Sequence, residues 1–147
     1  MKFPLITIVA VLVVAASYAF FRKKSPVDLL AALQKEMEPK GGTVFQTMLE
    51  GKNTAFLLLN CEVFLLDVAD GKVKREKVLK PGFYLGFTAC TDQSISAEGG
   101  YALANLANRA IGAGGGNTSG GAYRSKDGRV WEKKTSKGWR PVDEAQN

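Results

Sequence analysis

The segment from Ala55 to Asp67 constrains the fold more than any other part of the chain, because apolar residues occupy both alternating positions of a strand there. A strand with one face in water alternates apolar and polar side chains, whereas this segment is apolar on both faces. Both faces must therefore be covered by other elements. A membrane span is the alternative interpretation, but Asn60, Glu62 and Asp67 would make its burial in lipid costly.

One cover for this segment is an amphipathic helix from Pro26 to Glu38. Ser25 is a favoured N-cap residue, and Pro26 suits the first helical position because its missing N–H needs no partner there. Asp28 lies near the positive end of the helix dipole. Apolar residues recur near the 3.6-residue period on one face: Val27, Leu30, Leu33 and Met37.

Turn signals and strand-forming residues predict an antiparallel β-meander after this helix. The segments predicted as strands are Thr43–Leu49, Thr54–Ala69, Lys72–Leu79 and Phe83–Ala89. Asp70-Gly71 is the sharpest turn signal, because a type I′ turn requires positive φ at both central residues and this pair tolerates it. We therefore expect Glu62–Ala69 to fold back on Lys72–Leu79.

The remaining chain is predicted as a second packing helix, a linker and a small ribbon. Gly100–Ile111 fits a helix with Leu103, Leu106 and Ala107 on one face, and residues 112–122 are glycine-rich. Residues 123–147 contain turn signals that predict a basic, aromatic β-ribbon and tail. The expected fold class is α+β, with residues 25–111 as the main domain after an amino-terminal anchor over residues 1–24.

The anchor prediction comes from the uncharged segment Phe3 to Phe21, whose 19 residues could cross a bilayer as a helix. A cleaved signal peptide is the alternative, since Ser17-Tyr18-Ala19 resembles a cleavage site. The length of the segment and the basic residues 22–24 favour an uncleaved signal-anchor. We therefore expect a single-pass membrane protein of a bacterial inner membrane or a viral membrane, with the side of its domain left open.

Cys61 and Cys90 are the only cysteines and have two possible states. They can form one disulfide, or they can be two buried thiols that pack as small apolar residues. Two cysteines 29 positions apart in a chain without histidine make a poor metal site, so no metal or cofactor is expected.

The absence of histidine also removes most catalytic chemistry, because imidazole is the usual general base of hydrolases. Glu62 and Asp67 would face opposite sides of one strand and cannot form a carboxylate pair. Ser125, Asp127, Gly128 and Trp131 resemble the Asp-box of sialidase-like propellers, but the spacing is one residue short and one copy builds no propeller. We therefore assign no family and expect no enzyme.

The ribbon is the candidate binding surface, because aromatic and basic residues alternate there and can stack on bases or contact headgroups and phosphates. The candidate binding residues are Tyr123, Arg124, Arg129, Trp131, Lys133, Lys134, Trp139 and Arg140. Packing of the two tryptophans inside the protein is the structural alternative.

Two functions remain. The first is a membrane-anchored accessory or assembly protein that binds another protein in or at the membrane through its α+β domain. The second is a tethered binder of polyanions, meaning anionic lipid headgroups or nucleic acid, through the ribbon and the basic segment Lys72–Lys80. Polyanion binding should weaken steeply with salt, which distinguishes the two.

Overall fold

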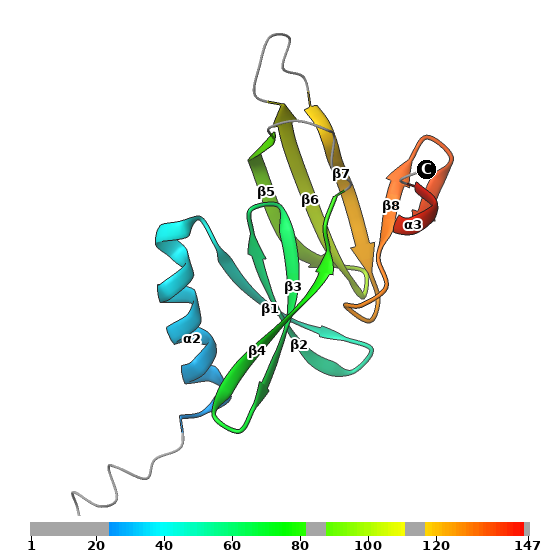
Figure 1. Cartoon of the computed structure of the whole chain (residues 1–147). Helices are drawn as coiled ribbons and strands as arrows, with labels where there is room; N and C mark the ends of the chain where they lie inside the picture. Colours follow the sequence, from blue (N-terminus) through cyan, green and yellow to red (C-terminus); the bar gives the residue numbers. More distant parts are fainter. Residues whose placement is uncertain (1–23, 82–87, 111–116, 146–147) are drawn as a thin grey trace, which may run out of the picture.

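Two antiparallel sheets and a helix form three layers in the computed structural model, which describes residues 24–81, 88–110 and 117–145 (Figure 1). The helix is α2 (Pro26–Met37). Sheet A consists of β1 (Thr43–Leu49), β2 (Lys52–Leu59), β3 (Glu62–Ala69) and β4 (Lys72–Leu79). Sheet B consists of β5 (Thr88–Glu98), β6 (Tyr101–Ala110), β7 (Asn117–Ser125), β8 (Glu132–Thr135) and β9 (Gly138–Pro141), followed by the short helix α3 (Val142–Ala145). In each sheet, strands adjacent in sequence are adjacent in space.

The start of α2 confirms the predicted cap. The Ser25 hydroxyl accepts a hydrogen bond from the backbone N–H of Asp28, and the Asp28 carboxylate accepts one from the backbone N–H of Ser25. These reciprocal bonds satisfy donors that the first turn of a helix leaves unpaired. The α-helix ends at Met37 and continues as the 3₁₀ helix η1 (Glu38–Lys40), which Gly41 terminates with a φ of 73°.

Both faces of β2 are covered, as the apolar segment predicted. Ala55 and Leu57 are buried with Leu30, Leu33 and Met37 of α2. Phe56 and Leu58 point the other way, into the core between the two sheets. Sheet A is therefore the middle layer, with α2 on one face and sheet B on the other.

Two-residue turns join the strands of sheet A. Asp70 and Gly71 have φ values of 53° and 71°, which confirms the predicted turn between β3 and β4. The break between β2 and β3 at Asn60 and Cys61 was not predicted, because neither residue is a glycine or a proline. Their φ values of 52° and 58° give the same turn conformation.

The predicted helix over Gly100–Ile111 is wrong, because residues 101–110 form β6 and Ile111 lies outside the described residues. Ala102, Ala104 and Leu106 are buried at alternate positions against sheet A, which is the period of a strand. Gly99 and Gly100, with φ values of 57° and 79°, turn the chain back from β5. Pairing with β5 and β7 outweighs the helix propensity of the alanines.

The α+β fold class is therefore corrected to a mostly β domain of two antiparallel sheets. Residues 117–122 of the predicted linker belong to β7, and residues 112–116 lie outside the described part of the chain. The strand predicted at Phe83–Ala89 falls largely on residues that are not described, and β5 begins at Thr88.

The single-pass membrane assignment is also corrected. No helix within residues 24–81, 88–110 and 117–145 has the length and apolar character needed to cross a membrane. The signal-anchor predicted from Phe3 to Phe21 lies outside the described residues. We therefore no longer assign the protein to a bacterial inner membrane or a viral membrane.

Candidate functional site

The β8–β9 hairpin is attached to the other strands of sheet B at few positions. Only two residue pairs, Tyr123 with Lys133 and Arg124 with Glu132, join β8 to β7. The hairpin and α3 lie on the opposite side of the molecule from α2 in Figure 1. The backbone N–H of Val142 donates to the carbonyl oxygen of Trp131 at 3.1 Å and holds the end of β9 near the start of β8. The hairpin therefore has much of its own surface free.

Arg124 fixes the base of this hairpin. Its guanidinium carbon lies 4.6 Å from the ring centroid of Tyr101 and 4.5 Å from that of Trp139. Its Nε donates to the Glu132 carboxylate at 2.6 Å. A cation between two aromatic faces is attracted by both rings, and the carboxylate adds a charge-assisted hydrogen bond. These contacts connect β6, β7, β8 and β9.

The loop of residues 126–131 anchors the other side. The Asp127 carboxylate accepts hydrogen bonds from the Ser125 hydroxyl and from the backbone N–H groups of Arg129 and Val130. Burial alone would raise the pKa of Asp127, but these hydrogen bonds outweigh it and hold the pKa below its usual value. The resulting turn places Trp131 in the core between the sheets, where its ring meets Phe56 edge to face at a centroid distance of 6.0 Å.

The structure separates the eight sequence-predicted binding residues into two groups. Tyr123 and Trp131 are only 1% and 3% exposed, so these two belong to the core and cannot contact a ligand. Arg124 is held by the rings of Tyr101 and Trp139 and by the Glu132 carboxylate. Arg129 donates two hydrogen bonds to the Glu76 carboxylate of β4, at 2.8 and 2.6 Å. These residues support the fold, because their functional groups already have partners or are buried.

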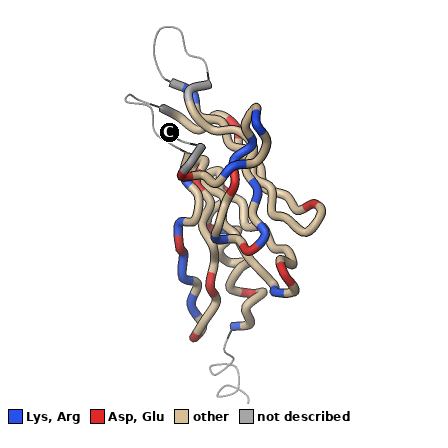
Figure 2. The backbone as a smooth tube through the Cα atoms, turned by 90° about the vertical axis from the view of Figure 1, so that its right-hand side faces the viewer, with Lys and Arg blue, Asp and Glu red and all other residues tan. Residues whose placement is uncertain are grey.

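The other four predicted residues come together on the hairpin. Lys133 pairs across the strands with Arg140, and Lys134 pairs with Trp139. Cross-strand partners share a face, so each face of the hairpin carries cations, and one also carries a half-buried indole. Lys134, Lys137 and Arg140 are exposed and form no ion pair within the described residues. Figure 2 shows Lys and Arg concentrated here and along β4.

Sequence reasoning missed Tyr101, Glu132 and Lys137. Tyr101 falls within the predicted helix Gly100–Ile111, and Glu132 lies in the predicted ribbon with no role assigned to it. Their roles depend on strand pairing, which brings Glu132 opposite Arg124. Lys137 is at the tip of the hairpin, and two indications pointed to it: its place among the basic residues of the ribbon and the Ser136-Lys137-Gly138 turn signal.

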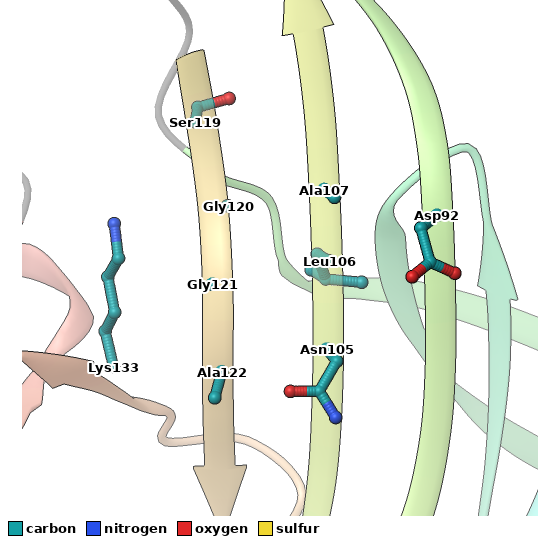
Figure 3. Close-up of a pocket in the computed structure, with 9 residues that line it drawn as sticks. All are labelled: Asp92, Asn105, Leu106, Ala107, Ser119, Gly120, Gly121, Ala122 and Lys133. Atoms are coloured by element: carbon teal, nitrogen blue, oxygen red, sulfur yellow. The ribbon is translucent and has the colours of Figure 1, made fainter. Parts of the chain in front are cut away.

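A shallow groove of about 520 Å³ crosses β5, β6 and β7 beside the hairpin (Figure 3). Asp92 borders one side and Lys133 the other. Small residues form its floor: Ala107, Gly120, Gly121 and Ala122. A Cβ at Gly120 would lie 2.1 Å from the carbonyl oxygen of Leu106, so the backbone approach requires glycine. Lys133 therefore belongs to the hairpin and also borders the groove.

Tyr123 gives a testable consequence of this packing. Its buried hydroxyl has no hydrogen-bond partner among the described residues, and burial raises its pKa to about 12 from the usual 10.0. Tyr123→Phe removes an unsatisfied polar group and should raise the free energy of unfolding by about 1 kcal/mol at pH 8. Between pH 10 and about 12 the unfolded chain has released a proton that the folded protein retains, so wild-type stability falls as pH rises.

Urea titrations of both proteins at pH 8 and pH 11 measure this effect. Between pH 8 and pH 11 the free energy of unfolding of the wild type should fall by roughly 1.4 kcal/mol more than that of the phenylalanine variant. Equal alkaline losses in the two proteins would show that Tyr123 titrates normally.

No group of histidine, cysteine, aspartate and glutamate side chains that could hold a metal ion occurs in the part of the chain that the structure describes. Comparison with known proteins assigns no family to the chain: no family model, no curated protein and no solved structure matches it.

Proposed function

We propose that the protein is a non-enzymatic binding protein that binds polyanions through the β8–β9 hairpin. The observation that carries this proposal is the group of exposed cations at Lys134, Lys137 and Arg140, which have no ion pair within the described residues, on a hairpin with few attachments to its sheet. Lys133 extends this group to the edge of the groove. Closely spaced cations attract a polymer whose negative charges are also closely spaced.

The contrast with β4 supports the hairpin as the binding element. Strand β4 is equally rich in cations, but Lys77 contacts the Glu62 carboxylate at 2.7 Å, and Glu76 within the strand pairs with Arg129. Lysines on such an edge strand also serve to prevent pairing with other chains. Strand β9 is likewise an edge strand, but the exposed hairpin cations Lys134, Lys137 and Arg140 form no ion pair within the described residues.

Trp139 supplies the apolar part of the proposed surface. Arg124 lies against its ring, and the indole remains half-buried beside the exposed Lys134. An indole next to cations can pack on the apolar part of a ligand whose charged groups contact the lysines. Trp139 also provides a fluorescence signal for binding, because the other tryptophan, Trp131, is in the core.

The structure contains a disulfide between Cys61 and Cys90. It favours a polyanion outside the reducing cytoplasm over nucleic acid, since disulfides persist mainly in oxidising compartments. An accessory protein that binds a protein partner is the second candidate function. The exposed Val130 side chain, next to the hairpin and 67% accessible, favours it. The salt dependence of binding separates the two, because an apolar contact is much less sensitive to salt.

The experiment is a titration of the full chain with inorganic polyphosphate, followed by Trp139 fluorescence at several salt concentrations. The binding variant carries Lys133→Gln, Lys134→Gln and Arg140→Gln. The matched control carries Lys52→Gln, Lys72→Gln and Lys74→Gln, which removes the same charge from exposed positions of sheet A.

We expect the binding variant to lose roughly thirtyfold in affinity at low salt, and the salt slope to fall by about one unit for each removed cation. The control should retain the slope of the wild type. Vesicles of phosphatidylglycerol and phosphatidylcholine in a second titration test lipid phosphates as the source of charge. Equal losses in both variants would place the binding outside the hairpin, and salt-insensitive binding would favour the protein-partner function.

A further inference from the structure

The disulfide between Cys61 and Cys90 joins the two sheets and presents its two sulfur atoms unequally. Cys61 lies in the turn between β2 and β3, and Cys90 is in β5, with their Cα atoms 5.5 Å apart. Cys61 is 0% exposed and belongs to the core between the sheets. Cys90 is only partly buried, at the margin of that core. A reagent from solvent therefore meets Cys90 first.

A cleft of about 470 Å³ lies beside the disulfide and can admit a small molecule. Its lining includes both cysteines together with Asn60, Glu62, Lys80 and Asn108. The amides offer hydrogen bonds to a ligand, and Lys80 brings a positive charge to the cleft.

Glu62 and Lys80, the charged residues of the cleft lining, balance each other, and a second lysine outside the lining also contacts the Glu62 carboxylate. This carboxylate contacts Lys77 at 2.7 Å and Lys80 at 3.3 Å. Burial alone would raise the pKa of Glu62, but the hydrogen bonds from both lysines outweigh it and hold the pKa below its usual value. The three groups together carry one net positive charge, which attracts anionic reagents.

The turn at Cys61 has an unfavourable backbone conformation for its residue type. The turns between β1 and β2, β3 and β4, and β5 and β6 all hold glycine at the second central position, with positive φ: Gly51, Gly71 and Gly100. Cys61 adopts a φ of 58° at the equivalent position. A side chain in this region costs about 1 kcal/mol relative to glycine. The two-residue turn between β2 and β3 imposes this conformation, so the cost does not depend on the disulfide.

We propose that Cys90 is a site of thiol–disulfide exchange for small anionic thiols, which enter the cleft beside the disulfide. The thiolate attacks Cys90 Sγ and forms a new S–S bond with it. The Cys61–Cys90 bond breaks, and Cys61 Sγ leaves with the electron pair and takes a proton from water. The reagent thiol is oxidised to the mixed-disulfide level, and Cys61 is reduced to a thiol. A second thiol molecule would release Cys90 from the adduct by the same step.

Reduced glutathione is the probe, and the full chain is the protein. After partial reaction the sample is quenched with acid, unfolded and treated with N-ethylmaleimide, and peptide mass mapping locates both modifications. We expect glutathione on Cys90 and maleimide on Cys61, with at least tenfold preference for this arrangement. The same reaction in denaturant should distribute glutathione nearly evenly between the two cysteines.

Lys80→Gln tests the role of charge, with Lys72→Gln as the control on an exposed lysine remote from the cleft. Lys80→Gln should slow exchange with glutathione about threefold and leave unchanged the rate with cysteamine, whose attacking thiolate form has no net charge because of its ammonium group. Glutathione on Cys61, an even distribution in the folded protein, or no reaction without denaturant would overturn the proposal. Equal rates in both lysine variants would overturn its preference for anionic thiols.

Discussion

Removing the disulfide by Cys61→Ala together with Cys90→Ala should lower the free energy of unfolding by about 3 kcal/mol. The cysteines are 29 positions apart, and a cross-link over a loop of that length restricts the unfolded chain by roughly this amount. The disulfide lies at the contact between the two sheets. At this contact the Gln93 side chain also accepts a hydrogen bond from the backbone N–H of Cys61 and donates one to the carbonyl oxygen of Gly41. Urea titration of both proteins measures the difference.

A second double variant, Cys61→Gly with Cys90→Ala, separates the cross-link from the strain in the turn. Glycine adopts the positive φ of position 61 without the steric cost, so this variant should recover about 1 kcal/mol relative to the alanine variant. Equal stability of the two double variants would show that the turn is unstrained. Wild-type stability in both would show that the disulfide does not constrain the chain.

Gly128→Ala should be similarly disruptive, with a loss of about 3 kcal/mol. Gly128 has a φ of 79°, and a Cβ there would lie 2.8 Å from Cζ of Phe56, a fully buried ring that cannot move aside. The expected loss combines the backbone cost of a side chain at positive φ with overpacking of the core. Thermal and urea unfolding measure it.

Gly138→Ala is the matched control for this prediction. Its φ is 97°, but no atom lies within 4 Å of the added Cβ. This variant should therefore lose only about 1 kcal/mol, from the backbone term alone. Equal losses at positions 128 and 138 would mean that Phe56 yields to the new methyl group.

The parts of the fold that could be predicted from sequence are those with a local physical cause. Ser25 and Pro26 mark the start of α2 because a helix end needs a cap, and Asp70-Gly71 marks a turn because its φ values suit few other residues. The two-sided apolar character of residues 55–67 correctly required a layer on each face of sheet A.

The errors have a physical origin in tertiary pairing. The alanines of residues 101–110 satisfy the helix period and the strand period equally well, because a small apolar side chain fits either face. The pairing with β5 and β7 makes this segment a strand, and no local sequence pattern indicates that pairing. The turn at Cys61 was missed for a related reason, since a cysteine replaces the expected glycine there.

The candidate site was predicted only in outline. The basic and aromatic composition located the hairpin, but it could not show which aromatic residues would be buried. Tyr123 and Trp131 are in the core because the hydrogen bonds of Asp127 turn the chain inward before β8. That a polyanion binds to Lys133, Lys134 and Arg140 of the hairpin stays a prediction, which the polyphosphate titration tests.

The order of the strands also has a consequence for how the chain folds. Within the described residues, every strand pair joins neighbours in sequence, and the last strand of sheet A ends at Leu79, before the first strand of sheet B begins at Thr88. Contacts between near neighbours in sequence form with a small loss of chain entropy, which favours rapid folding. During synthesis the amino-terminal layers can therefore form while the second half is still being translated, and they offer a preformed surface on which the later strands assemble.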